Sequence, residues 1–367
     1  MKVAILLNRN YASYRSIGKN ILNMGYQMVK GRFANLTGVV LPEYDSFAKI
    51  LDSNPFYMGT ERDVDWEALR GYDLLIWEWG WTETPPRTLI TIRKNLDIPT
   101  LAFTGALDRF WRELNYDCLG LHLEAVQYTD MVGVILKDTI PFYKSVCPDA
   151  HVFHMPVPVD VNNFYSYSLS PEMKDHKTVL LTAPTQFQGI SSQLPITTYL
   201  AFKDVLSRKN DLNGICFTYY GKDEEARARG VFQSLGISER IEIQPFLRPI
   251  FRYFEKVNPC YIGINLSHSL IQARIALISA CLGIPMVVSD DIETHTLLYP
   301  FTTVKWYDTA RAADLCLRLL EDREFYNKVC TEALERVNYY NIDNCRKRML
   351  EGIELGLSLR GKREVHP

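Results

Sequence analysis

The sequence predicts an α/β protein with two Rossmann-like domains that face each other across a cleft. Short apolar runs alternate with amphipathic segments along most of the 367 residues, which is the pattern of parallel sheets with helical crossovers. The alternation stops once, at a segment rich in Pro, Asp and Asn over residues 155–164, and then starts again. A chain of this length is also long for a single core, so two domains are expected.

In the first half, buried apolar runs predict strands over residues 2–7, 37–41, 73–77, 100–104, 131–136 and 151–154. Helical periodicity predicts helices over residues 14–29, 86–95, 107–114, 121–129 and 137–146. We therefore expect an N-terminal Rossmann-like domain over residues 1–160. The polar segment 161–176 is the expected linker.

In the second half, the expected strands are residues 177–182, 214–220, 241–243, 260–265, 287–289 and 303–305. Helices are expected over residues 194–206, 223–235 and 248–256, and over most of the chain from 306 to about 356. This pattern predicts a C-terminal Rossmann-like domain over residues 177–340. Residues 341–367 are expected to form a helix and a tail that pack back on the N-terminal domain.

Residues 265–290 predict a loop, a buried helix, a stop and a strand. Ser269 and Gln272 have the spacing of a capping box, which predicts that the helix starts at Ser269. Apolar side chains occupy most sides of the expected helix, as in a buried helix. Gly283 is its expected end, because Pro285 cannot continue a helix.

The start of this helix is the candidate ligand site. A helix start presents unpaired N–H groups and a partial positive charge to whatever lies before it. His268 precedes the expected start and Arg274 follows it. A phosphate group is therefore the ligand that we expect here.

Composition limits the function classes. A net charge of -2 makes nucleic acid an unlikely partner, although binding of nucleic acid through a local basic groove stays an alternative. The eight cysteines form no CxxC pair or Cys/His cluster, so we expect no metal site and no disulfide framework. The apolar start is too short for a signal peptide or a membrane span, which predicts a cytoplasmic protein. The basic tail over residues 359–364 is either a solvated end or a peripheral contact with acidic lipid.

The segment Ala280-Cys-Leu-Gly-Ile-Pro-Met-Val-Val-Ser289 resembles the Ala-Cys-Gly-x-Pro-Val-Val signature of the GT-B glycosyltransferases. The order of landmarks at residues 154–164 and 241–246 is similar to that of the glycogen-synthase-like, family 4-like group. The resemblance covers essentially the whole chain. It implies the GT-B fold, with the acceptor on the N-terminal domain and the donor on the C-terminal domain.

The resemblance also implies a function. A hexosyltransferase of this group moves a sugar from a nucleotide-diphosphate donor, here UDP- or GDP-linked, to a hydroxyl of a glycan, a lipid-linked or another acceptor. The implied reaction needs no metal and no further cofactor, and retention of configuration is the more frequent outcome in this group.

The chain departs from the family at two places. The family usually carries two glutamates that hold donor hydroxyls, and here their places fall on Leu270 and Ile278. After the first strand of the second half, the family has cations, whereas this chain has none before Lys203. The departures favour a divergent member and leave two alternatives. One is a non-catalytic relative that binds nucleotide sugar or glycan. The other is an enzyme of the phage type that glucosylates DNA bases, a branch that also carries an Arg in this helix.

The candidate donor-binding residues are Thr185, Gln188, Gly221, Lys222, Phe246, His268, Ser269, Gln272 and Arg274. Several have a structural alternative. Arg274 is either the main counter-charge of a diphosphate or the partner of Asp290 or Asp291. Ser269 and Gln272 are either ligands or a helix cap alone. Gly221 and Phe246 serve equally well in a tight turn and in an aromatic core.

In the first domain, Asn8, Arg9, Trp79 and Trp81 are the candidate acceptor-binding residues. Tryptophans beside carboxylates at a strand end suit stacking on sugar faces, and a hydrophobic plug is the alternative. Glu78 and Asp108 are the candidate catalytic residues. Asp108 would act as general base if the enzyme inverts, or would only begin a helix together with Arg109.

Overall fold

The computed structural model describes the backbone of residues 1–8, 50–51, 54–58, 65–79, 86–104, 116–181, 196–218, 222–245, 251–268 and 273–364. The chain forms two compact units. The first unit comprises Met1–Val159 together with Tyr340–Pro367, and the second comprises Asp160–Tyr339. Each unit is built around a six-stranded parallel sheet.

The first unit has the strand order β2-β1-β3-β4-β5-β6. Its elements are β1 (Val3–Asn8), β2 (Asn54–Met58), α4 (Trp66–Arg70), β3 (Leu74–Trp79), α5 (Pro86–Asn95), β4 (Thr100–Thr104), α7 (Tyr116–Gln127), β5 (Met131–Val134), η3 (Lys137–Thr139), α8 (Ile140–Val146), β6 (His151–His154) and α17 (Ile342–Glu364).

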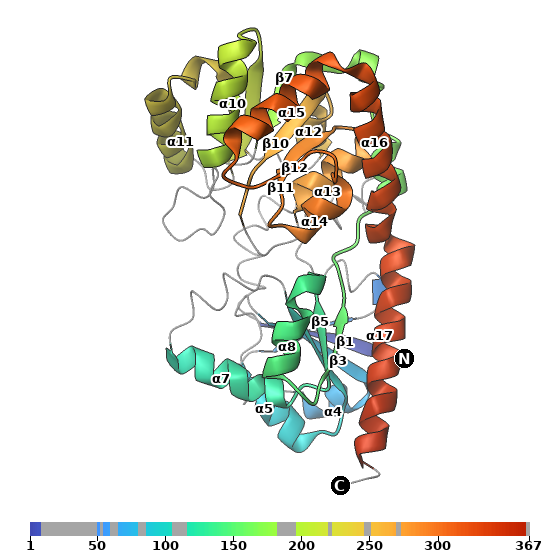
Figure 1. Ribbon diagram of the computed structural model, residues 1–367. Helices are drawn as coiled ribbons and strands as arrows, with labels where there is room; N and C mark the ends of the chain where they lie inside the picture. The colour runs from blue at the N-terminus through green and yellow to red at the C-terminus, as the bar shows by residue number, and fades with distance from the viewer. Residues whose placement is uncertain are drawn as a thin grey trace. The chain divides into compact units, whose positions relative to one another are not determined.

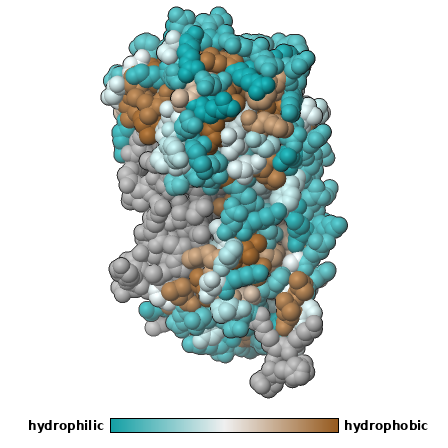
Figure 2. Space-filling view, in the orientation of Figure 1, coloured by the Kyte–Doolittle hydropathy of each residue, from teal (hydrophilic) through white to brown (hydrophobic). Residues whose placement is uncertain are grey.

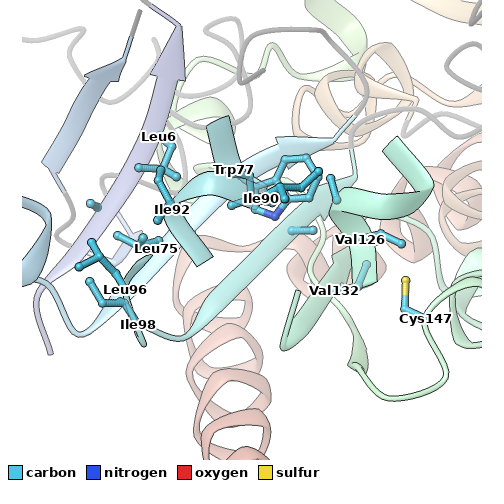
Figure 3. Close-up of a cluster of buried hydrophobic side chains, with 14 of the residues drawn as sticks. Leu6, Leu75, Trp77, Ile90, Ile92, Leu96, Ile98, Val126, Val132 and Cys147 are labelled. Carbon is cyan, nitrogen blue, oxygen red and sulfur yellow. The ribbon is translucent and has the colours of Figure 1, made fainter. Parts of the chain in front are cut away.

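The sheet of the first unit is buried on both faces. Successive side chains of a strand point to opposite sides, so β1, β3, β4, β5 and β6 each contribute residues to both of the clusters that cover the sheet. Ala4 and Leu6 of β1 pack with α5, α7 and α8. Figure 3 shows part of this cluster, in which Leu6, Leu75 and Trp77 of the strands lie with residues of α5. Val3 and Ile5 belong to the cluster on the other face, which contains residues of α17. Burial on both faces explains why these strands read as continuous apolar runs.

Helix α17 covers the second face of this sheet (Figure 1). Two glycines allow its close approach: a Cβ at Gly352 would overlap the ring of Phe153, and one at Gly356 would overlap Met131. At its far end, Arg360 joins Asp130 and Asp97 in ion pairs. The first unit is therefore completed by residues from the end of the chain.

The second unit has the strand order β12-β11-β10-β7-β8-β9. Its elements are α9 (Val161–Tyr165), η4 (Pro171–Met173), β7 (Asp175–Leu181), α10 (Ile196–Arg208), β8 (Asn213–Thr218), α11 (Lys222–Leu235), η5 (Ser238–Arg240), β9 (Ile241–Pro245), α12 (Phe251–Val257), β10 (Cys260–Asn265), α13 (Arg274–Cys281), β11 (Met286–Ser289), α14 (Glu293–Leu298), β12 (Thr303–Val304), α15 (Thr309–Glu321) and α16 (Arg323–Val337).

The chain passes between the units twice, and the two passages are neighbours. The N–H of Val159 donates to the carbonyl of Tyr340 at 2.8 Å. The short η6 helix (Asn338–Tyr340) lies at the second passage. The segment 161–176, expected as a linker, belongs to the second unit and forms α9, η4 and the first residues of β7.

Several elements differ from the sequence-based expectation. Strand β2 was not among the expected strands, and it contains Pro55, which has no N–H to donate. This proline is tolerated because β2 is an edge strand. Helix α13 begins at Arg274 rather than at Ser269. The predicted elements over residues 14–29, 37–41 and 107–114 lie outside the described residues.

On the face that Figure 2 shows, hydrophilic side chains cover most of the described residues, with hydrophobic ones in smaller groups between them. None of the helices in the described ranges combines the length and the apolar character that are needed to cross a bilayer.

The fit of α17 predicts the effect of a single added methyl group. Gly352→Ala should lower the free energy of unfolding by about 1–3 kcal/mol, because the methyl group overpacks against the buried Phe153 ring. Gly361→Ala is the matched control on the same helix, since a Cβ there has no atom within 4 Å. Urea unfolding of both variants measures the difference. Equal stability of the two would contradict this account of the α17 contact.

Candidate functional site

The strand order of the second unit reverses between β7 and β10. From β7 the chain adds β8 and β9 on one side, and it then returns to place β10, β11 and β12 on the other. Ligands of open α/β sheets bind outside the carboxyl ends of the strands at such a reversal. The residues that follow β10, which include His268 and Arg274, therefore lie at the expected ligand position of this unit.

Helix α13 follows β10 and is held firmly at its C-terminal end. The N–H of Gly283 donates to Ala280 and that of Ile284 to Ser279, which is a Schellman motif. Gly283 has φ +63°, in the left-handed region that favours glycine. The sequence-based prediction of a stop at Gly283 is confirmed.

A buried lysine also binds this helix end. Lys174 Nζ donates to the carbonyl of Leu282 at 2.9 Å and to that of Asn258 at 3.1 Å. The hydroxyl of Ser168 donates to the same Leu282 oxygen at 2.8 Å. A cation at a helix C-terminus complements the helix dipole, but burial lowers the pKa of Lys174 to about 8.

The described part of α13 begins at Arg274, and its cap residue is Ala273, which makes no side-chain hydrogen bond to the helix. Ser269 and Gln272, the residues of the predicted capping box, lie outside the described residues. The capping box therefore stays a prediction.

Arg274 is the first residue of α13 and is half-buried. The two carboxylates proposed as its structural partners have other partners here. Asp290 forms an ion pair with Lys305. Asp291 lies 2.8 Å from Nδ1 of His268.

His268 lies between two loops of the sheet edge. Asp291 approaches it from the turn after β11. Trp306, from the loop after β12, lies with its ring centroid 5.5 Å away at an interplanar angle of 36°. The His268 side chain remains 44% exposed. Its ring is therefore restrained on two sides and still reaches solvent.

A second, fully buried network lies beneath this loop. The Nδ2 of Asn265 lies 3.3 Å from Nε2 of His295, and Nδ1 of His295 lies 3.2 Å from the Ser289 carbonyl. Burial lowers the pKa of His295 to about 3, so the ring is neutral and accepts at Nε2 while it donates at Nδ1. The hydroxyl of Ser289 donates to the Ser267 carbonyl. This network joins the ends of β10 and β11.

Most of the other predicted site residues lie outside the described part of the chain. This holds for Arg9, Trp81, Asp108, Thr185, Gln188, Gly221, Phe246, Ser269 and Gln272. For Asn8, Glu78, Trp79 and Lys222 the backbone is described and the side chain is not. Asn8, Glu78 and Trp79 lie in the last residues of β1 and β3, and Lys222 begins α11. Their proposed roles stay predictions.

The structure adds three residues that the sequence analysis did not select for this site: Asp291, Trp306 and His295. A signal was present, because Asp290 and Asp291 directly follow the buried strand β11. Polar residues at the end of a parallel strand often face the ligand edge of a sheet. The contact of Trp306 with His268 had no local signal, since it joins two different loops.

Within the described ranges, no group of three or more His, Cys, Asp or Glu side chains is placed to hold a metal ion. The seven cysteines whose side chains are described are free thiols. Burial raises the pKa of Cys147 and of Cys260 to about 12, so these two thiols are poor nucleophiles at neutral pH.

No family model and no curated protein matches the sequence. Solved structures match the fold at low sequence identity. Anabaena HepE in complex with UDP has a TM-score of 0.65 at 11% identity, covering 96% of this chain and 100% of HepE. The α,α-trehalose 6-phosphate synthase from Burkholderia multivorans has a TM-score of 0.62 at 13% identity, covering 82% of this chain and 74% of the synthase.

A mutant of S. aureus TarM, in complex with Fondaparinux, α-GlcNAc-glycerol and UDP, has a TM-score of 0.58 at 10% identity. The match covers 76% of this chain and 55% of TarM, so the chain spans about half the length of that protein. These proteins are glycosyltransferases of two Rossmann-like domains. The chain has the GT-B fold. Identities this low show the fold alone.

The buried lysine behind α13 predicts a pH dependence of stability. The pKa of Lys174 is about 8 in the folded protein and 10.5 when exposed. Between these values the unfolded chain holds a proton that the folded protein does not, so this residue makes stability rise with pH. From pH 7.5 to 9.5, the wild type should gain about 2 kcal/mol relative to Lys174→Met.

Urea unfolding of the wild type and Lys174→Met at both pH values measures this difference. The buried thiols titrate in both proteins and cancel in the comparison. Parallel stability profiles of the two proteins would contradict a lowered pKa for Lys174.

Proposed function

We propose that the chain is a glycosyltransferase that moves a sugar from a nucleotide-diphosphate sugar, UDP- or GDP-linked, to an acceptor hydroxyl. One observation carries the proposal. His268 and Arg274 flank the loop between β10 and α13, at the sheet reversal where this fold class binds its ligands. The match to HepE, whose structure contains UDP, supports the same class of ligand.

The donor diphosphate is proposed to bind at the start of α13. The guanidinium of Arg274 and the N–H groups of the first helical turn supply its counter-charge. Because the cap residue is Ala273, its own side chain does not compete with a ligand for these N–H groups. The fixed C-terminal end of α13 holds the helix start in place for this role.

In the transfer, the bond between the anomeric carbon and the diphosphate oxygen breaks and a bond to the acceptor oxygen forms. The acceptor hydroxyl loses its proton, and the nucleoside diphosphate leaves with the bonding electron pair. Positive groups aimed at the leaving diphosphate stabilise the charge that develops there. The acceptor is proposed to be a glycan, a lipid-linked or another hydroxyl compound, with Asp108, Glu78 and the tryptophans on the acceptor side.

Metal independence and retention of configuration are the finer parts of the proposal. Arg274 supplies a fixed cation, which favours neutralisation of the diphosphate by the protein itself. Turnover should then persist in EDTA. The anomeric configuration of the glycosidic bond in the product, measured by NMR, should equal that of the donor.

A second candidate is a protein that binds nucleotide sugar without transferring it. Ile278 occupies the place of a glutamate that the resembled group uses to hold donor hydroxyls, and it is buried within α13. A buried isoleucine cannot bind a hydroxyl group. Tight binding of nucleotide sugars without transfer or hydrolysis would favour this candidate.

The first test of the proposal is nucleotide binding by calorimetry. The wild type should bind UDP or GDP, and Arg274→Ala should weaken the affinity about tenfold, since a hydrogen bond to a charged group of the ligand is lost.

Arg229→Ala is the matched control, because Arg229 pairs with Glu225 on the surface of α11. It should bind as the wild type does. No binding of either nucleotide by the wild type would overturn the proposed function. Unchanged binding by Arg274→Ala would overturn the proposed place of the diphosphate.

A further inference from the structure

We infer that Asp291 sets the tautomer of His268, so that Nε2 of His268 accepts a hydrogen bond from a hydroxyl of the donor. The inference rests on the proposed function, because it assigns a role within the same donor site. The hydroxyl belongs either to the ribose or to the sugar that is transferred. Asp291 is then a positioning residue that acts through His268.

The carboxylate of Asp291 fixes the proton of the ring. An ionised carboxylate only accepts hydrogen bonds, and its Oδ2 lies 2.8 Å from Nδ1 of His268. The Nδ1 atom therefore carries the hydrogen. In the neutral imidazole, Nε2 then holds a lone pair and is an acceptor. Among the described residues, Nε2 has no hydrogen-bond partner.

A hydrogen-bond acceptor at Nε2 of His268 binds some groups of a nucleotide sugar better than others. Phosphate oxygens only accept hydrogen bonds, so they are poor partners for a neutral Nε2. Hydroxyl groups donate and suit it. The indole ring of Trp306, half-buried beside His268, adds the apolar surface on which a sugar ring packs.

The ring is held in one orientation by contacts from two loops. Asp291 holds one edge, and Trp306 lies against the ring. The ion pair of Lys305 with Asp290 ties the loop after β12 to the turn after β11. The charged groups that these contacts place at this edge are Asp291, which pairs with His268, and Asp290 and Lys305, which pair with each other.

The residue before His268 supplies an independent observation. Ser267 is 2% exposed, and none of the described residues is a hydrogen-bond partner of its hydroxyl. A buried hydroxyl that lacks a partner is costly and requires an explanation. A polar ligand bound against this loop would satisfy it.

The test combines binding with a spectroscopic readout at pH 8. Binding of UDP, 2′-deoxy-UDP and UDP-glucose is measured by calorimetry for the wild type, His268→Ala, Asp291→Asn and the double variant. Each single variant should bind the hydroxyl-bearing probe about tenfold more weakly. The double variant should be no weaker than His268→Ala, because Asp291 acts through the imidazole.

The three probes identify the hydroxyl. If the 2′-hydroxyl of the ribose binds Nε2, the loss should appear with UDP and vanish with 2′-deoxy-UDP. If the 3′-hydroxyl binds it, the loss should appear with both. If the transferred sugar binds it, the loss should appear with UDP-glucose alone. The ¹⁵N shifts of the His268 ring should report the Nδ1–H tautomer in the wild type and a shift toward Nε2–H in Asp291→Asn.

Asp314→Asn is the control variant, since Asp314 pairs with Arg208 on the exposed surface of the same unit. It should leave binding and the His268 shifts unchanged. Wild-type binding that neither His268→Ala nor Asp291→Asn weakens would overturn this inference alone. The same follows if the wild-type ring is the Nε2–H tautomer, or if Asp291→Asn weakens binding further in the His268→Ala background. A wild type that binds none of these probes and does not bind GDP would overturn the proposed function as well.

Discussion

The second unit depends on the hydrogen bonds that hold the C-terminal end of α13, above all those to the carbonyl of Leu282. This carbonyl receives hydrogen bonds from the ammonium of Lys174 and the hydroxyl of Ser168. The hydroxyl of Tyr299 adds bonds to the carbonyls of Ala276 and Ile284. Unpaired carbonyls at a buried helix end are costly, so these partners allow α13 to be buried. Its first residue, Arg274, is thereby held at the edge of the sheet.

The same edge is built in two layers. The lower layer is the buried chain of Asn265, His295 and Ser289, which joins β10 to β11. The upper layer is the His268–Asp291 pair beside Trp306. A site is effective when its contact residues are held by a supporting shell. The neutral, fully bonded His295 supplies that support without bringing a charge into the core.

The sequence predicted more of the fold than of the contacts within the candidate site. The expected bounds of α5, β4 and β10 coincide with those of the structure, because a proline, a polar segment or an apolar run marks each end. Strand β2 was missed because its pairing with β1 overrides the local signal of Pro55. The start of α13 was placed five residues before Arg274, the first residue of the described helix, because capping-box spacing is only a local pattern.

For the site, His268 and Arg274 were selected from their place beside a helix start, which is local information. Asp291, Trp306 and Lys174 act across gaps of 23, 38 and 108 residues from the groups that they contact. Only the strand order brings those segments together. No periodicity or spacing in the sequence reports such contacts.

The close pairing of Val159 with Tyr340 means that the second unit is inserted into the first. During synthesis on the ribosome, the six strands of the first sheet emerge before the second unit, but one face of the sheet stays without α17 until residues 342–364 have been made. The inserted unit has all of its own elements before that point. The part of the protein that is translated first is thus the part that completes its folding last.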